Sequence, residues 1–341
     1  MNPGKIIRTL TGPAARFISL QQMISVTGQK LIQPFYHSVS DTQLPHLRHV
    51  LKIRNVATFK ADLAFFLKYF RPVDAREVMQ KTINQTRWER PSFHLSFDDG
   101  LKEMVTVVAP LLIQKGIPAT FFINSGFIGN KDLFFRYKAS LLIEKTESLH
   151  TEIRVRFNRI LDNYGIEKGD PRHRLLSVDY PRKAVLDEIA PILEVSFRTY
   201  TDNREVYMNE KDIRELQQQG FIIGAHSVDH PSYKNLAPEE QIRQTYQSLQ
   251  YLEKSFGVAP ALFSFPFSDE GVSAEFFHRI YRPQGPADLT FGVSGLKKEG
   301  FPAHLHRIPM ENGRSASGNI RGEYLYYMMK AALNKNIIKR K

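Results

Sequence analysis

Short apolar runs alternate with longer amphipathic segments through most of the chain. The short runs are rich in aromatic and β-branched residues and end at turn-forming residues, which is typical of buried strands. The predicted strands cover residues 32–36, 91–97, 119–124, 221–225, 262–267, 289–293 and 304–308.

Between these runs, apolar residues recur at helical spacing. The spacing predicts helices over residues 101–115, 209–220, 238–257 and 274–281. Asn209 is a candidate N-cap with Asp212 three positions later, and Gly257 is a candidate C-terminal stop.

Strands and helices that alternate at short spacing favour parallel βα units. Seven predicted strands are enough for a closed or nearly closed barrel, so the sequence predicts an α/β fold of that kind. A doubly wound open sheet is the alternative.

Residues 131–204 do not follow this alternation of strands and helices, because the segment is long, charged and mainly helical in pattern. We interpret them as a helical insertion that shapes the substrate cleft without carrying chemistry. The predicted organisation is an N-terminal extension over residues 1–30, a barrel over 31–318 and a basic C-terminal helix over 319–341.

The amino-terminal segment is basic but has no continuous apolar core, so it does not resemble a signal peptide. The longest uncharged run, residues 116–130, is too short and too interrupted to cross a bilayer. These features predict a cytoplasmic protein whose membrane contact is at most peripheral, through amphipathic helices at either end. The oligomeric state stays open.

Composition narrows the possible chemistry. The chain of 341 residues has no cysteine, which excludes disulfides, thiol nucleophiles and cysteine-ligated metals. Its 47 Lys and Arg against 35 Asp and Glu give a formal net charge of +12, which favours anionic partners. Specific nucleic-acid binding is not expected, since no nucleic-acid-binding motif accompanies the charge.

Polar residues gather where four predicted strands end, at the edge where parallel βα folds build their sites. One carboxylate from Asp98-Asp99 and the pair His226 and His230 would supply three ligands to a divalent metal ion. The second carboxylate would then be free to accept a proton. His37 and the segment 264–269 follow two further strands.

The segments "FHLSFDDG", "KGIPATFFINSGFIG" and "GFIIGAHSVDHPSYKNL" closely resemble the NodB-homology polysaccharide deacetylases, carbohydrate esterase family 4. The resemblance covers roughly residues 34–310, and "PFYHSVSD" is similar to the branch acting on poly-N-acetylglucosamine. It implies a distorted (β/α)7 barrel that binds Zn²⁺ or another divalent metal ion.

The resemblance also implies residue roles. Asp98 would be the catalytic base, and the metal ligands would be Asp99, His226 and His230. The backbone N–H of Phe267, which follows the Pro of the third motif, would bind the oxyanion.

Two positions depart from the family pattern. Ser264 stands where the family usually has an Arg that pairs with the base, so we expect the pKa of Asp98 to be higher than in relatives that keep this Arg. The fifth motif, which supplies a general acid, is irregular in "HLHRIPMEN"; His306 is the better candidate there, and His37 is the alternative.

The resulting hypothesis is a metal-dependent carbohydrate N-deacetylase, a hydrolase acting on non-peptide C–N bonds in acetylated carbohydrate substrates. A metal-containing glycan-binding barrel with weakened catalysis is the alternative, because Ser264 and the irregular fifth motif could both lower turnover.

Overall fold

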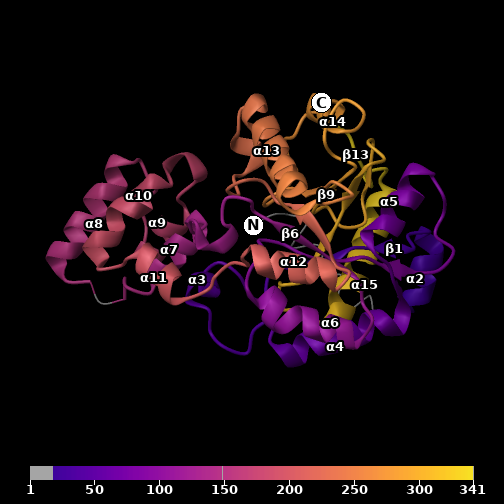
Figure 1. Cartoon of the computed structure of the whole chain (residues 1–341), viewed down its shortest axis with the longest axis horizontal. Helices are drawn as coiled ribbons and strands as arrows, with labels where there is room; N and C mark the ends of the chain where they lie inside the picture. The colour runs from indigo at the N-terminus through magenta and orange to yellow at the C-terminus, as the bar shows by residue number, and fades with distance from the viewer. Residues whose placement is uncertain (1–17, 148, 341) are drawn as a thin grey trace.

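A ring of parallel strands forms the centre of the computed structural model, which describes residues 18–147 and 149–340 (Figure 1). The main sheet has the order β11-β9-β8-β7-β6-β5-β2-β12, and every strand pair in it is parallel. These strands are β2 (Pro34–Tyr36), β5 (Leu95–Phe97), β6 (Ala119–Ile123), β7 (Ile222–Ala225), β8 (Leu262–Ser264), β9 (Leu289–Gly292), β11 (His304–His306) and β12 (Ile308–Pro309).

The last strand closes the ring. β11 and β12 are separated only by Arg307; β11 pairs with β9, and β12 pairs with β2 at the other end of the sheet. The eight strands therefore occupy seven positions around the barrel, with the seventh shared by the two halves of one strand. The predicted α/β fold with a distorted (β/α)7 barrel is confirmed.

Helices cover the outside of the barrel, and their ends follow the sequence signals. Asn209 forms a capping box with Asp212 at the start of α12, and Gly257 ends α13 in the left-handed conformation that glycine adopts readily. The covering helices are α2 (Leu20–Thr27), α4 (Val56–Tyr69), α5 (Ala75–Ile83), α6 (Ala109–Gln114), α12 (Glu210–Gln218), α13 (Pro238–Phe256), α14 (Ala274–Ile280) and α15 (Ala316–Ala332).

One predicted helix is irregular. Residues 101–115 were expected to form a single α-helix, but a π-helical segment over Met104–Val108 precedes α6. Pro110 lies in the first turn of α6, and its ring nitrogen has no hydrogen to donate to the preceding turn. The regular hydrogen-bond pattern therefore begins again only after this proline.

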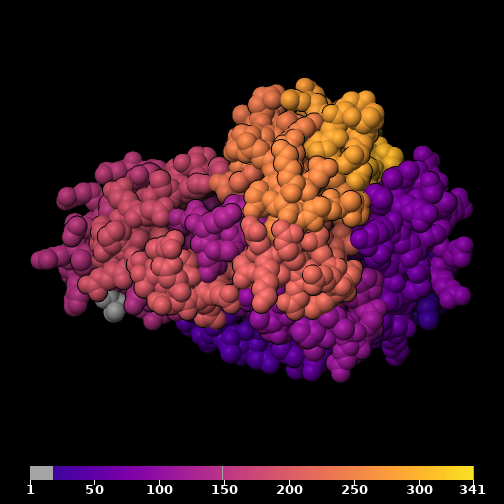
Figure 2. Space-filling model, viewed as in Figure 1, coloured from indigo at the N-terminus to yellow at the C-terminus, as the bar shows by residue number. Residues whose placement is uncertain are grey.

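The insertion forms a helical lobe beside the barrel, on the left in Figures 1 and 2. It has its own buried apolar cluster, in which Phe157, Leu175 and Leu186 are fully buried and Leu47 and Tyr207 join from flanking segments. Its elements are α7 (Phe135–Ile143), α8 (Thr151–Asn163), α9 (Pro171–Leu176), α10 (Ala184–Ile189) and α11 (Phe197–Asn203), with 3-10 turns at Tyr180–Arg182 and Ala190–Leu193.

Short elements complete the fold. Two small parallel sheets join β1 (Leu31–Ile32), β4 (Ser92–Phe93) and β3 (Arg71–Pro72), and β10 (Lys298–Glu299) with β13 (Ile337–Ile338). The remaining helical turns are α3 (Pro45–Arg48) and the 3-10 turns Ile128–Asn130 and Tyr233–Asn235.

The C-terminal helix packs on the barrel. α15 buries Ile320, Tyr324 and Tyr327 in the main core, and the Tyr324 hydroxyl donates to the carbonyl of Gln29, just after α2. No helix among the described residues is long and apolar enough to cross a membrane. Residues 1–17 of the predicted N-terminal extension lie outside the described part of the chain.

The separate core of the insertion leads to a stability prediction. Phe157→Ala removes a fully buried ring from this core, and we expect the free energy of unfolding to fall by about 3–5 kcal/mol. Urea denaturation followed by circular dichroism measures the change. Val155→Ala on the same helix is the control, because Val155 is 51% exposed and should change stability little. Equal effects of the two substitutions would contradict this packing.

Candidate metal centre and active site

Asp98 and Asp99 lie directly after β5, where its hydrogen bonding to β2 ends. The N–H of Asp98 still donates to the carbonyl of Tyr36 at 2.9 Å, whereas Asp99 leaves the strand with φ of 72°. Both side chains are almost fully buried. Gly100 follows at φ of 67°, and a Cβ there would meet Ile123 Cγ2 at 2.9 Å, so the turn needs a residue without a side chain.

The two histidines converge on Asp99. His226 follows β7 directly, and its Nε2 lies 3.6 Å from Asp99 Oδ1; the Nε2 of His230 lies 3.2 Å from the same oxygen. These separations are close to the roughly 3.4 Å edge of a tetrahedron with metal–ligand bonds of about 2.1 Å. Three side chains predicted as metal ligands are thus brought together.

The polar atoms at this point fit a metal ion. Among the described residues, Asp99 Oδ1 is buried and has no hydrogen-bond partner. His226 Nδ1 lies 2.8 Å from the carbonyl oxygen of Ser264, so Nδ1 donates a proton and Nε2 presents its lone pair. Buried acceptors without donors are costly, and a bound cation would satisfy them.

The insertion contributes a residue that the sequence analysis missed. The hydroxyl of Tyr137, on α7, donates a short hydrogen bond to Asp99 Oδ2 and leaves Oδ1 facing the histidines. Tyr137 is fully buried. The expectation that the insertion only shapes the cleft is therefore incomplete, because it also orients a predicted metal ligand.

Asp98 is paired with an arginine from the far end of the chain. Arg307 donates two parallel hydrogen bonds to Asp98, from Nη1 to Oδ1 at 2.7 Å and from Nη2 to Oδ2 at 2.8 Å. Its guanidinium also donates to the hydroxyls of Ser96 and Ser264, and the side chain is completely buried inside the barrel. Phe35 and Phe122 hold the guanidinium between their rings, with centroids 4.3 and 5.1 Å from Cζ.

The expectation that Asp98 lacks a cation is therefore wrong. Burial opposes ionisation of Asp98, but the charge and hydrogen bonds of Arg307 lower its pKa below the usual carboxyl value. Ser264 stands at the position where the family usually has an arginine. Its hydroxyl accepts a hydrogen bond from Arg307, which supplies the cation from another strand. No local sequence signal linked position 307 to position 98.

Phe267 lies beside the metal ligands. Its ring packs edge-on against His230 with centroids 4.8 Å apart, and the side chain is 41% exposed. Its backbone has φ of 56°, and among the hydrogen bonds of the described residues none comes from its N–H. This N–H is therefore open to an acceptor from outside the chain.

Left-handed backbone conformations concentrate at this site. Among the described residues, four of the eight non-glycine residues with positive φ are Asp99, Ser227, His230 and Phe267. Such conformations are strained for residues with a Cβ and are kept where the surrounding structure enforces them, which is common at functional sites.

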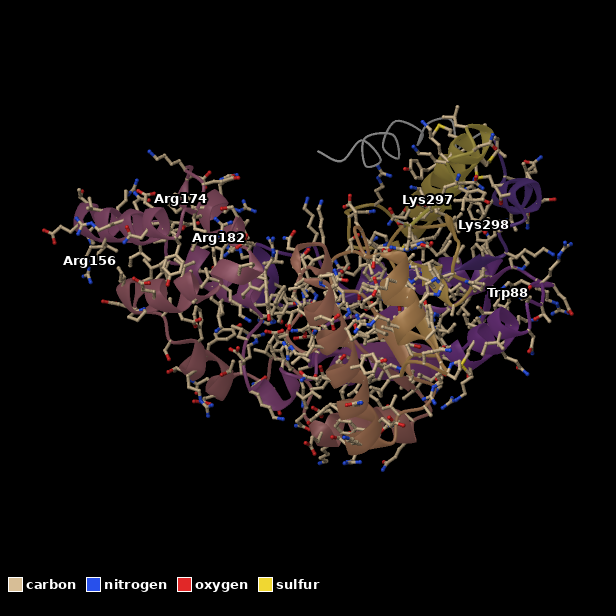
Figure 3. All side chains as sticks on the ribbon, turned by 90° about the horizontal axis from the view of Figure 1, so that it is seen from above. Trp88, Arg156, Arg174, Arg182, Lys297 and Lys298 are labelled. Atoms are coloured by element: carbon tan, nitrogen blue, oxygen red, sulfur yellow. The ribbon has the colours of Figure 1, made fainter. Side chains whose placement is uncertain are left out.

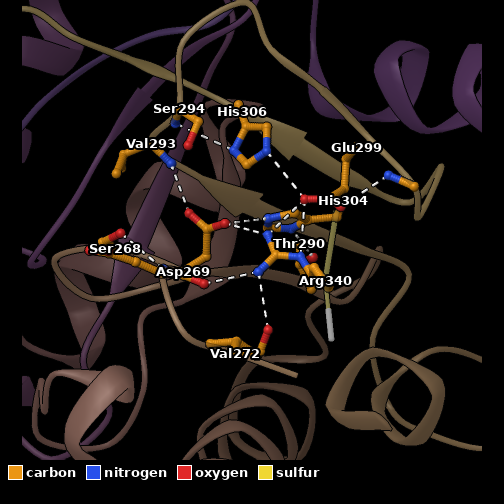
Figure 4. Close-up of polar contacts among 12 residues, drawn as sticks. Ser268, Asp269, Val272, Thr290, Val293, Ser294, Glu299, His304, His306 and Arg340 are labelled. Atoms are coloured by element: carbon orange, nitrogen blue, oxygen red, sulfur yellow. Dashed lines mark hydrogen bonds and ion pairs between the residues drawn. The ribbon is translucent and has the colours of Figure 1, made fainter. Parts of the chain in front are cut away.

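His306 lies elsewhere. It precedes Arg307 on the last strand, so the two side chains point to opposite faces of the sheet. Arg307 enters the barrel, whereas His306 faces outward, where its Nε2 lies 3.5 Å from Glu299 Oε2 (Figure 4). The structure thus does not bring His306 to Asp98 and Asp99.

The outward cluster around His306 already contains a cation from the chain itself, Arg340. His304 lies 3.2 Å from Asp269 Oδ2, and Arg340 donates to both Asp269 and Glu299 (Figure 4). Two carboxylates and two histidines here would also suit a metal ion, but the guanidinium of Arg340 lies between the carboxylates and already supplies the positive charge.

His37 lies at the same strand edge as the two aspartates. It directly follows Tyr36, the residue of β2 that pairs with Phe97, so it is next to Asp98 across the strand ends. Its Nδ1 lies 2.5 Å from Glu311 Oε2. Burial lowers the pKa of His37, but the Glu311 carboxylate, with smaller contributions from Asp99 and Asp98, raises it to about 9. His37 is therefore a cation at neutral pH.

Solved structures share this fold. The chain is 14% identical to IcaB from Ammonifex degensii (TM-score 0.54), covering 86% of this chain and 97% of that one. It is also 14% identical to the Streptococcus pyogenes deacetylase PplD in complex with acetate (TM-score 0.53), covering 86% and 98%. A de-N-acetylase from Aggregatibacter actinomycetemcomitans is 16% identical, with a TM-score of 0.50 and coverage of 85% and 99%. Identities this low establish the shared fold alone.

Comparison of the sequence with models of protein families gives a more specific result than the shared fold. No curated protein matches the chain. The family model for polysaccharide deacetylase matches residues 86–153 and 168–276, slightly more than half of the chain. These two ranges contain Asp98, Asp99, His226, His230 and Phe267. With its closed parallel barrel and the matched sequence around these residues, the chain belongs to the polysaccharide deacetylase family.

Proposed function

We propose that this protein is a metal-dependent hydrolase that removes acetyl groups from N-acetylated sugars. The observation that carries the proposal is the convergence of His226 and His230 on an unpartnered oxygen of Asp99, next to a second carboxylate held by Arg307. One carboxylate is thereby free to bind a cation while its neighbour is free to accept a proton.

The metal ion would be held by Asp99, His226 and His230, with Zn²⁺ as the first candidate because the donors are one carboxylate and two imidazoles. A divalent ion bound there supplies Lewis-acid chemistry, which polarises the acetyl carbonyl and activates a water molecule. Tyr137 and the carbonyl of Ser264 orient two of the ligands from behind.

Asp98 acts as the general base in this proposal. Arg307 keeps its carboxylate ionised and fixes its orientation through two hydrogen bonds. Asp98 Oδ2 lies 3.8 Å from His226 Nε2, close enough to the ligands to take the proton of an attacking water.

Two further groups complete the reaction. The N–H of Phe267 would donate to the oxygen of the tetrahedral intermediate, because this residue lies against His230 and its N–H has no partner in the described chain. His37 would protonate the departing amine, because Glu311 keeps it charged beside Asp98. We assign this role to His37 in place of His306, which faces the outside of the barrel.

The alternative, a metal-containing glycan-binding barrel with weakened catalysis, loses its main support. It rested on the loss of the arginine at position 264 and on the irregular fifth motif. Arg307 provides the missing cation to Asp98, and His37 provides a charged acid at the same edge. A pure glycan-binding protein has no need for either arrangement.

The two aspartates should have separable roles. Asp98→Asn should leave the metal content nearly unchanged and lower kcat by about 10²–10⁴-fold, which is the usual contribution of a general base. Asp99→Asn should weaken metal binding, and added metal should restore part of its activity. Metal analysis of the purified variants, with acetate release from N-acetylglucosamine oligomers, measures both effects. If Asp98→Asn kept full deacetylase activity, the proposed base would be wrong.

Removing the hydroxyl of Tyr137 should weaken metal binding. Tyr137→Phe deletes the donor to Asp99 while keeping the ring, so we expect metal affinity to fall by about 10–100-fold. Competition with a fluorescent chelator measures this affinity. Tyr200→Phe is the matched control, since the Tyr200 hydroxyl contacts His46 rather than Asp99. Unchanged affinity in Tyr137→Phe would show that this hydrogen bond does not support the site.

The charge on Glu311 should set the alkaline limb of the pH profile. His37 must be protonated to donate, so turnover should persist below its raised pKa of about 9 and fall as the pH rises through that value. Glu311→Gln removes the carboxylate that contributes most to raising this pKa, and the alkaline limb of kcat should move to lower pH. Glu239→Gln, at a site 78% exposed, is the control. An alkaline limb at the same pH in Glu311→Gln would exclude His37 as the group that titrates there.

A further inference from the structure

One arginine beside the proposed active site has no carboxylate partner. Four arginines whose side chains are at most 7% exposed each pair with a carboxylate: Arg54 with Asp62, Arg174 with Asp162, Arg307 with Asp98, and Arg340 with Asp269 and Glu299. Arg136 is partly buried and forms no ion pair with any described residue. Its desolvated charge is therefore not compensated by a carboxylate of the described chain.

The guanidinium of Arg136 is also poorly satisfied by hydrogen bonds. Its Nη1 donates to the carbonyl of Leu176 at 3.0 Å, which is the one hydrogen bond of this guanidinium among the described residues. Its Nε is buried without a partner, as are the Nε atoms of Arg174 and Arg307, but those two arginines also pair with carboxylates. Burial lowers the pKa of Arg136 from its ordinary value, although the group stays charged at neutral pH. A desolvated cation with free donors is unfavourable unless an acceptor from outside the chain joins it.

Arg136 lies next to the reaction site. The following residue on α7, Tyr137, donates to Asp99, and the Arg136 guanidinium carbon lies 5.5 Å from the ring of Phe267. That ring in turn packs against His230. One helix therefore carries both the residue that orients a predicted metal ligand and an unpaired cation beside the proposed oxyanion residue.

Local carboxylates do not neutralise this cation. Asp229, in the same loop as His230, accepts hydrogen bonds from the Lys183 ammonium and the Tyr180 hydroxyl, both at 2.7 Å. The rings of Phe135 and Phe267 lie 5.8 and 5.5 Å from the guanidinium carbon, distances at which cation–π attraction is modest. Among the described residues Nη2 has no hydrogen-bond acceptor.

We propose that Arg136 forms a subsite for an anionic group of the substrate, so that the preferred substrate is an acidic N-acetylated glycan. The anion would be a sugar carboxylate or a phosphate on the unit next to the acetylated sugar, bound by the planar guanidinium fork. This inference rests on the proposed deacetylase function and adds the substrate class to it. The net charge of +12 would also attract such a polymer.

The test compares two tetrasaccharides on the metal-loaded protein. One is the neutral N-acetylglucosamine tetramer, and the other alternates N-acetylglucosamine with glucuronic acid. Loss of a charge-assisted contact changes affinity by about 10–100-fold, so Arg136→Gln should raise KM for the acidic tetrasaccharide by that factor. KM for the neutral tetramer, and kcat for both, should stay within about twofold because the acetyl group and its ligands are untouched.

Arg156→Gln is the matched control. Arg156 is an exposed arginine of α8 in the same lobe (Figure 3), and its loss changes the net charge by the same amount. It should leave the KM values of both tetrasaccharides unchanged. Equal KM changes for acidic and neutral substrates in Arg136→Gln, or no change for either, would overturn the proposal.

Binding measurements keep this inference separate from the proposed function. If neither tetrasaccharide releases acetate, the deacetylase proposal fails, and isothermal titration of the acidic and neutral tetramers still tests the anion subsite. Titration with N-acetylglucosamine 6-phosphate distinguishes phosphate from carboxylate as the source of the anion. The subsite is supported if either anion binds at least tenfold more weakly to Arg136→Gln than to the unmodified protein, and it is refuted if neither does.

Discussion

The paired hydrogen bonds between Arg307 and Asp98 are the interaction on which the rest of the site depends. Arg307 lies between β11 and β12, where the last strand closes the barrel, and its side chain is fully buried. A buried arginine without its carboxylate, or a buried carboxylate without its arginine, would be strongly destabilising. The strand that closes the barrel therefore also places the cation that lowers the pKa of Asp98, which couples the fold to the proposed chemistry.

Successive side chains of the last strand point to opposite faces of the sheet, so its polar residues lie either inside or outside the barrel. Arg307 points into the barrel, whereas His304 and His306 point outward toward α14 and the C-terminal segment. Outside, Arg340 forms ion pairs with both Asp269 and Glu299. The two groups of potential metal ligands among the described residues therefore differ. The group around Asp269 and Glu299 contains a cation of the chain, whereas in the group around Asp99 the atom Oδ1 has no partner.

The helical insertion links catalysis to recognition in the proposed enzyme. Its helix α7 begins just beyond β6 and carries Arg136 and Tyr137 on adjacent positions. Consecutive helical residues are rotated by about 100° from each other, so one side chain reaches Asp99 and the other the ring of Phe267. Because the lobe has its own apolar core, its helix can be held firmly against the barrel edge.

The barrel and the motifs at its strand ends could be predicted from local patterns in the sequence. Period-two apolar runs and capped amphipathic segments are local patterns, and they identified the seven strand positions and the ends of α12 and α13. Asp98, Asp99, His226 and His230 were identified because each follows a strand within its own motif. The groups that support these four residues could be found only in the folded chain. Arg307, Tyr137 and Glu311 are distant in sequence from the atoms they contact, and the face on which His306 lies depends on strand register. A pairing across the closure of a barrel leaves no periodic signal, because its geometry exists only once all the strands are in place.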